Sequence, residues 1–126
     1  MKNVHVDMFE SLNGQLMAFH SEITTLVKKS PNDAVNKFKL GLVNSVLRKS
    51  NSFLGAKRLP FADFEAFGEE TMPSTSDVLM IIGQYLAAFE KLRTENITLN
   101  YQHWYWVIED GNEENKRHTA PPKVLE

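Results

Sequence analysis

The stretch from residue 30 to residue 54 constrains the fold most, because it combines a helix-start signal with a long apolar repeat. The hydroxyl of Ser30 can cap a helix, and Pro31 suits the first helical position, where a missing N–H is no loss. Gly55 follows the last apolar residue and is a plausible stop. The sequence therefore predicts a long helix over 31–54. Its predicted apolar stripe is Val35, Phe38, Leu42, Val46 and Phe53, widened by Leu40, Val43, Leu47 and Leu54.

Two further segments repeat apolar residues at helical spacing. The segment 4–29 alternates steps of three and four residues, which is a heptad pattern. The segment 75–95 follows Ser74, a second capping residue, and carries a similar seam. Because these seams are longer than an isolated three-helix bundle requires, we predict a homodimer. Between the second and third helices, three phenylalanines spaced by three predict a short helical turn over 61–67.

The chain changes character after residue 97. The segment 98–109 is rich in aromatic and β-branched residues and leads to an Asp110-Gly111 turn signal. We predict a strand there, or a hairpin over 98–118, followed by an extended tail over 119–126 whose last two residues resemble a cloning scar. A helix is the alternative for this segment. Its apolar face would be Ile97, Tyr101, Trp104 and Ile108.

Together these elements predict a mainly α fold in one domain over 1–124: a bundle of three long helices with a short Phe-rich helical turn and a C-terminal aromatic strand or hairpin. The hydrophobic fraction of 42% and charged fraction of 24% are ordinary for a soluble globular protein. Cysteine is absent, which excludes disulfides and thiolate metal sites. We find neither a signal peptide nor an apolar run of the roughly 20 residues that span a membrane, so we expect a cytoplasmic location.

Charge is distributed unevenly along the chain. The segment 28–58 holds eight basic residues and one acidic residue, whereas the segment 59–126 has a net charge of −7. The basic segment either pairs with the acidic half, within one chain or across a dimer, or binds nucleic acid or another anion. The net charge of −2 favours the first interpretation. The candidate anion-binding residues are Lys37, Arg48, Lys57 and Arg58.

No catalytic, cofactor or metal-binding motif is evident. The four histidines form no HExxH arrangement, and the chain has no GxSxG, no SxxK and no glycine-rich phosphate loop. An enzyme whose site is assembled from distant residues stays as an alternative. We favour a non-enzymatic protein without a cofactor.

The aromatic group of the predicted strand is the strongest candidate for a functional surface. On a strand, Trp104 and Trp106 share one face, while Tyr101, His103 and Tyr105 share the other. One face can cover the helices, which leaves the other for solvent, a ligand or another protein, unless all five residues pack in the core. Exposed tryptophan and tyrosine are enriched at interaction sites. We therefore expect a small protein-interaction or regulatory module, with nucleic-acid or anion binding by the basic segment 28–58 as the alternative.

Overall fold

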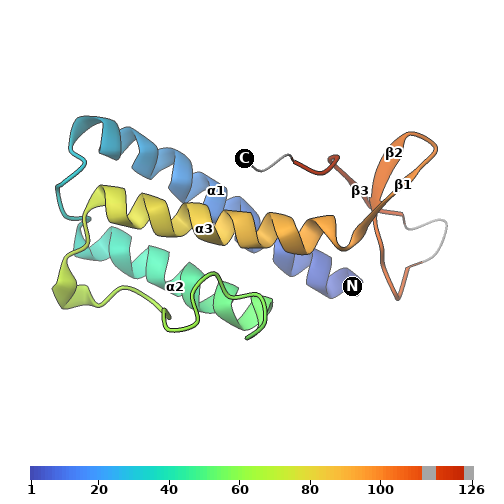
Figure 1. Cartoon of the computed structure of the whole chain (residues 1–126), viewed down its shortest axis with the longest axis horizontal. Coiled ribbons are helices and arrows are strands. Elements are labelled where there is room, and N and C mark those ends of the chain that lie inside the picture. The colour runs from blue at the N-terminus through green and yellow to red at the C-terminus, as the bar shows by residue number, and fades with distance from the viewer. Residues whose placement is uncertain (112–115, 124–126) are drawn as a thin grey trace.

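The computed structural model describes residues 1–111 and 116–123, and it confirms the predicted mainly helical fold with a small C-terminal sheet (Figure 1). The long helices are α1 (Asn3–Lys29), α2 (Lys37–Leu54) and α3 (Thr75–Thr94), and a single 3-10 turn, η1 (Glu69–Thr71), lies between α2 and α3. The strands are β1 (Ile97–Asn100), β2 (His103–Trp106) and β3 (His118–Thr119).

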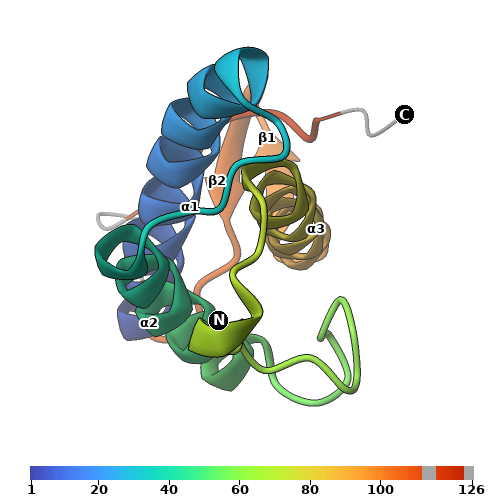
Figure 2. The same ribbon diagram turned by 90° about the vertical axis from the view of Figure 1, so that its left-hand side faces the viewer.

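α1 packs along α3 in the opposite direction, and α2 lies beside α1 and farther from α3 (Figures 1 and 2). The sheet projects from the end of the bundle where α1 begins and α3 ends. The heptad seams of α1 and α3 meet inside the chain, where Phe9 and Phe89 have ring centroids 5.3 Å apart. Both seams are therefore used within one chain, and they no longer argue for a homodimer.

The start of α2 differs from the prediction. The helix begins at Lys37 and not at Pro31, and its cap is the side chain of Asn36, which accepts a hydrogen bond from the N–H of Lys39 at 2.8 Å. Ser30 instead ends α1 by donating its N–H to Leu26. The backbone of 31–35 is held by the start of α3, since residues 73–76 exchange hydrogen bonds with it. These bonds hold residues 31–35 in a turn. The helix therefore begins after the second capping residue, Asn36, and not after the first, Ser30.

The buried face of α2 also differs in part from the predicted stripe. Phe38 is 76% exposed and Leu42 is also exposed. Asn44, although polar, is only 2% exposed. The apolar residues cover about half of the helix, but only part of this arc is buried. The buried residues of α2 include Leu40, Val43, Val46, Leu47, Ser50 and Leu54.

The predicted helical turn over 61–67 is wrong, because this segment forms turns without helix. Two amide side chains of α2 satisfy its backbone instead. Asn44 both donates to the carbonyl of Phe67 and accepts from its N–H, each at 2.9 Å. Asn51 donates to the carbonyl of Glu65 at 2.8 Å. With these partners supplied from outside, the segment packs Phe64 and Phe67 on the core without forming its own helical bonds.

The C-terminal segment forms strands, as predicted, and not the alternative helix. The position of the turn differs from the prediction. The sheet is antiparallel with strand order β1-β2-β3, and the tight turn is Tyr101-Gln102, not Asp110-Gly111. The segment near Asp110 is attached to the N-terminus, since Asp110 accepts the N–H of Asn3 at 2.8 Å. The predicted return strand is short and comprises only β3. Of the predicted tail, residues 124–126 lie outside the described part of the chain.

Ser50 leads to a stability prediction. It occupies a fully buried position on α2, and in the described part of the chain its hydroxyl has no hydrogen-bond partner. We expect Ser50→Ala to raise the free energy of unfolding by about 1–2 kcal/mol, because a buried unpaired hydroxyl is removed. The exposed Ser45→Ala on the same helix should gain only about 0.5 kcal/mol from helix propensity. Urea denaturation of both variants checks this; equal gains would contradict it.

Candidate functional site

The aromatic hairpin of β1 and β2 is covered by the helices at one end and open at the other. The register pairs Ile97 with Trp106 and Leu99 with Trp104, so these four residues share one face. Trp106 is 5% exposed, and its ring centroid lies 5.0 Å from that of Phe9. Trp106 is therefore a core residue and not part of an interaction surface. Beyond the helices the same face is open, and Leu99 is 56% exposed.

The opposite face of the hairpin carries a cluster around Tyr105. The ring of Tyr105 lies 4.6 Å from that of His118, and the amine of Lys116 is 5.4 Å from the tyrosine ring centroid. His103 also contacts His118, at 5.8 Å between ring centroids. Tyr105 is thus partly enclosed by its own neighbours. His118 was not among the predicted residues, because the sequence around β3 has little strand pattern.

Tyr101 occupies the apex of the hairpin and not a strand face. It is 90% exposed. Tyr101 and Gln102 have φ values of 49° and 68°, which identify a two-residue turn of type I′. Side chains in this left-handed region are strained by roughly 1–2 kcal/mol per residue. Leu99, Tyr101 and Trp104 together form a surface, called here the hairpin tip, that projects beyond the bundle.

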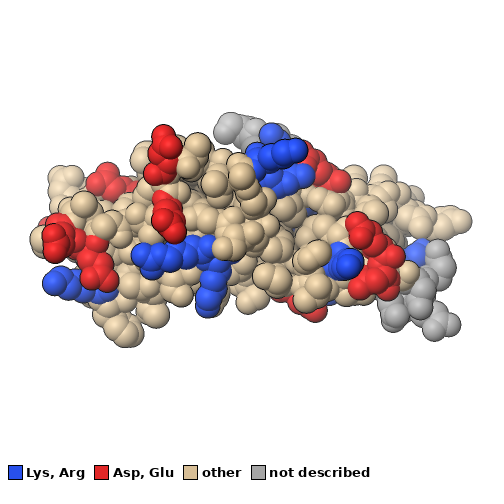
Figure 3. Space-filling model, turned by 90° about the horizontal axis from the view of Figure 1, so that it is seen from below, with Lys and Arg blue, Asp and Glu red and all other residues tan. Residues whose placement is uncertain are grey.

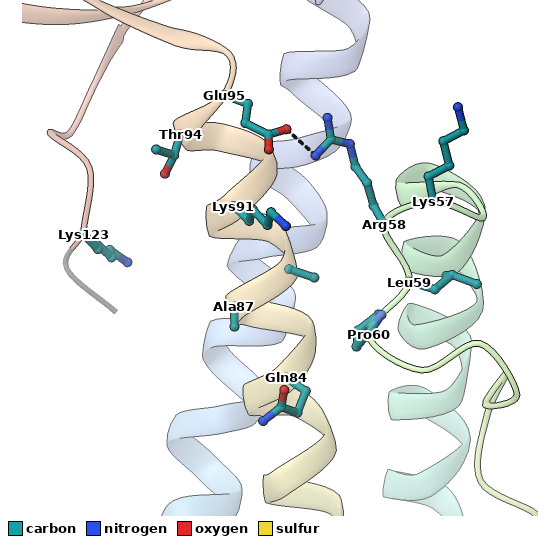
Figure 4. Close-up of a pocket in the computed structure, with 11 residues that line it drawn as sticks. Lys57, Arg58, Leu59, Pro60, Gln84, Ala87, Lys91, Thr94, Glu95 and Lys123 are labelled. Carbon is teal, nitrogen blue, oxygen red and sulfur yellow. Dashed lines mark ion pairs between the residues drawn. The ribbon is translucent and has the colours of Figure 1, made fainter. Parts of the chain in front are cut away.

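A second candidate is a groove of about 870 Å³ between α3 and the 57–60 loop (Figure 4). Its floor is apolar, with Leu59 and Pro60 on the loop and Ala87 and Ala88 on α3. Four cationic side chains line it, and they come from three parts of the chain: Lys57, Arg58, Lys91 and Lys123. This surface is called the basic groove.

The basic groove has an excess of positive charge. Arg58 reaches across it to form an ion pair with Glu95, the single acidic residue among the described residues that line it. Lys91 points from α3 toward the loop, and Lys123 approaches from the other side of α3. Three lysines therefore remain to attract an anion. Lys91 and Lys123 could not be found from the sequence, because both lie outside the basic segment and nothing in the pattern brings them together.

The structure separates the four residues predicted to bind an anion. Lys57 and Arg58 line the basic groove, whereas Lys37 and Arg48 lie on α2 outside it. Lys37 and Arg48 are eleven positions apart, about 16 Å along the helix axis. On the face of the molecule in Figure 3, basic and acidic groups are interspersed and form no continuous basic patch.

The basic segment 28–58 is neutralised only in part within the chain. Among the described residues its ion pairs are Lys39 with Glu22, at 3.2 Å, and Arg58 with Glu95. Only the second reaches the acidic C-terminal half. Whether the other six basic residues are paired across a dimer stays a prediction.

A buried ion pair on α3 holds the C-terminal segment. Arg93 binds both carboxylate oxygens of Glu90 at 2.8 Å and donates to Thr119, at 2.8 Å, and to the carbonyl of Pro121, at 2.9 Å. The N–H of Lys123 completes this clasp by donating to Glu90 at 3.0 Å. The spacing of Glu90 and Arg93 is a sequence signal for pairing on a helix, but their burial under the tail is not. The clasp places Lys123 at the basic groove.

The Glu90 carboxyl group makes the free energy of unfolding depend on pH. Its burial acts to raise the pKa, but hydrogen bonds from Arg93 and from the Lys123 N–H outweigh this, so the pKa lies below the ordinary value of 4.5. A lowered folded-state pKa stabilises the fold above the unfolded-state pKa, and this contribution is lost as the pH falls through the folded-state value. We expect the stability difference between wild type and Glu90→Gln to be largest near pH 7 and to shrink below about pH 4.5. Urea denaturation across this range checks it; a constant difference would contradict it.

The described residues offer no other evident chemistry. No group of three or more His, Asp or Glu in this part of the chain is placed to hold a metal ion. Burial raises the pKa of Tyr85, and a hydrogen bond to Asn51 partly opposes this shift. The tyrosine hydroxyl lies in the core. His5 and His20 lie on α1, whereas His103 and His118 lie in the sheet beside the start of that helix (Figure 1). Within 1–111 and 116–123 we find no pair of groups arranged for acid–base catalysis.

Along 1–111 and 116–123, none of the helices has the length and apolar character of a membrane-spanning segment. Comparison with protein-family models, with curated proteins and with solved structures gives no match for this chain.

Proposed function

We propose that this chain is a non-enzymatic protein-interaction module whose contact surface is the hairpin tip. One observation carries the proposal: an aromatic residue, Tyr101, is 90% exposed at the apex of a hairpin that projects beyond the bundle. Tyrosine and tryptophan in such positions often dominate the binding energy of interfaces, since they offer large rigid contact areas. Leu99 and Trp104 extend the surface on one face.

The strained turn supports the proposal. An Asn-Gly pair would adopt the same turn with little strain, yet the chain has Tyr101-Gln102 there. Strained backbone is retained mostly where it serves a function. Here it places Tyr101 at the apex of the hairpin, where the residue is 90% exposed.

Photocrosslinking tests this function. A p-benzoylphenylalanine residue replaces Tyr101, and a matched control places it at the exposed Lys49 of α2. On irradiation in the cells that make the protein, we expect position 101 to form a discrete crosslinked species that position 49 does not form. Equal or absent crosslinking at the two positions would overturn the proposal.

The turn gives a separate stability prediction. Replacing Tyr101-Gln102 by Asn-Gly should raise the free energy of unfolding by about 1–3 kcal/mol, because it relieves two left-handed side chains. The same variant should lose the contacts of the hairpin tip. Denaturation with urea measures the gain, and Tyr101→Ala alone is the control that removes the ring while leaving a strained turn. A less stable Asn-Gly variant would show that the tyrosine packs within the chain.

The basic groove supports a second candidate function, binding of a phosphate-bearing anion. Lys57, Lys91 and Lys123 all line one groove of the chain. We expect a fluorescein-labelled single-stranded oligonucleotide to bind at low salt and to lose about 20-fold in affinity between 50 and 200 mM salt, as for three phosphate contacts. Lys91→Ala should weaken binding several-fold, and Lys28→Ala, outside the groove, should not. No binding at 50 mM salt, or equal losses in both variants, would exclude it.

A further inference from the structure

The outer edge of β1 suggests which partner the hairpin takes. The strand order β1-β2-β3 makes β1 an edge strand, and its residues Thr98 and Leu99 are exposed. We propose that β1 pairs antiparallel with β1 of a second copy of this chain, so that the two sheets become one six-stranded sheet. This rests on the proposed function, because Leu99 and Tyr101 of the hairpin tip take part in the contact.

The hydrogen-bond pattern of the hairpin determines which groups are available. Across a two-residue turn, Asn100 and His103 form a hydrogen-bonded pair, and such pairs alternate along the ladder. The N–H of Val107 bonds the carbonyl of Asn96 at 2.8 Å, in phase with this alternation. The backbone groups of Ile97 and Leu99 therefore point to the outer edge. Among the described residues none bonds them there.

The side-chain alternation then selects the register. Residues opposite each other in an antiparallel pair share a face, so Ile97 and Leu99 must meet apolar residues and Thr98 must meet a polar one. Placing Thr98 opposite Thr98 of the second copy satisfies both conditions. Each Ile97 then lies opposite a Leu99, and all four outward groups of each strand find partners. The same register places Tyr101 opposite Glu95 of the second copy, at the end of α3.

The charges of the hairpin permit this self-association. The segment 97–108 contains no Asp, Glu, Lys or Arg, so two copies meet there without like charges facing each other. Exposed sheet edges are usually protected by lysine, proline or a bulge, and β1 contains neither lysine nor proline. An edge of neutral β-branched and apolar residues is suited to pairing.

The contact area predicts a weak dimer. An aromatic side chain buries about 150–250 Å², and adding Leu99 and the strand edge gives roughly 1,000 Å² for both copies, the low end for specific complexes. We therefore expect a dissociation constant on the order of tens of micromolar.

Disulfide trapping tests the register, since the chain has no cysteine of its own. Thr98 would face its copy in a non-hydrogen-bonded pair, with Cα atoms about 4.5 Å apart, within the range for a disulfide. Under mild oxidation we expect Thr98→Cys to form a covalent dimer of twice 14.4 kDa, and Gln102→Cys in the turn to form much less. Equal trapping at both positions, or none at position 98, would overturn the proposal.

Sedimentation equilibrium tests the association without a crosslink. Between about 5 and 300 µM, the wild type should shift toward the dimer mass as for a dissociation constant of tens of micromolar. Leu99→Lys should remain monomeric, while Val107→Lys, at 48% exposure against 56% for Leu99, should behave as wild type. A monomeric wild type throughout this range would exclude the second copy. Crosslinking of position 101 to a different protein would in that case still support the proposed function, so the two failures are distinguishable.

Discussion

Replacing Arg93 by alanine is expected to lower the free energy of unfolding by about 3–5 kcal/mol, the cost of leaving a buried charge without its partner. The loss would affect more than one ion pair. The guanidinium also binds Thr119 and the carbonyls of Ala120 and Pro121, so its removal unfastens the C-terminal segment from α3. Guanidinium denaturation followed by far-UV circular dichroism measures the change.

Lys91→Ala provides the control for Arg93→Ala. Lys91 lies on the same helix two residues away, is exposed and forms no ion pair with the described residues, so its loss should change stability by at most about 0.5 kcal/mol. A loss below about 1 kcal/mol for Arg93→Ala would mean that the clasp is not a stabilising feature. Glu90→Met tests the converse, because an apolar side chain leaves Arg93 buried and unpaired and should cost as much as Arg93→Ala.

Trp106→Ala is expected to cost about 3–5 kcal/mol, because it removes a buried ring that contacts Phe9 and joins the sheet to the bundle. Trp104 lies two residues away on the same strand but is only half-buried, so Trp104→Ala should cost about 1–2 kcal/mol. Comparing the two variants distinguishes a core position from a surface position on the same face of the hairpin. Thermal denaturation of both variants checks the difference.

The two tryptophans also answer the question that the sequence left open. If Trp104→Ala were the more destabilising variant, the hairpin would be seated on the helices differently from the structure described. If both were mild, neither ring would belong to the core. Only the expected order agrees with Trp104 as part of the hairpin tip and Trp106 as its anchor.

The helices that could be predicted best were those with one continuous apolar seam and no competing start signals. α1 and α3 satisfy this condition, and their observed bounds lie within one residue of the expected ones. α2 has two capping signals, Ser30 and Asn36, and local chemistry does not choose between them. Hydrogen bonds from residues 73–76, distant in sequence, select the second.

The errors at the loop and the turn have similar causes. The 61–67 segment has the phenylalanine spacing of a helix, but Asn44 and Asn51 supply its hydrogen bonds from α2. The hairpin reverses at Tyr101-Gln102, where neither Gly nor Asn occupies a left-handed position, so the usual signal is absent. The basic groove depends on residues from three segments, and only their packing brings them together.

The antiparallel packing of α1 on α3 affects the order in which the chain becomes folded during synthesis. The apolar face of α1 is complete at residue 29, but its main partner ends at residue 94. At roughly 5–20 residues per second, α1 is present for about 3–13 seconds before α3 has been made. During that interval α2 is the only long helix that can cover it, and Phe9 still lacks both Phe89 and Trp106. The nascent chain therefore exposes an amphipathic helix for seconds, which is the interval in which chaperones or premature aggregation would act on it.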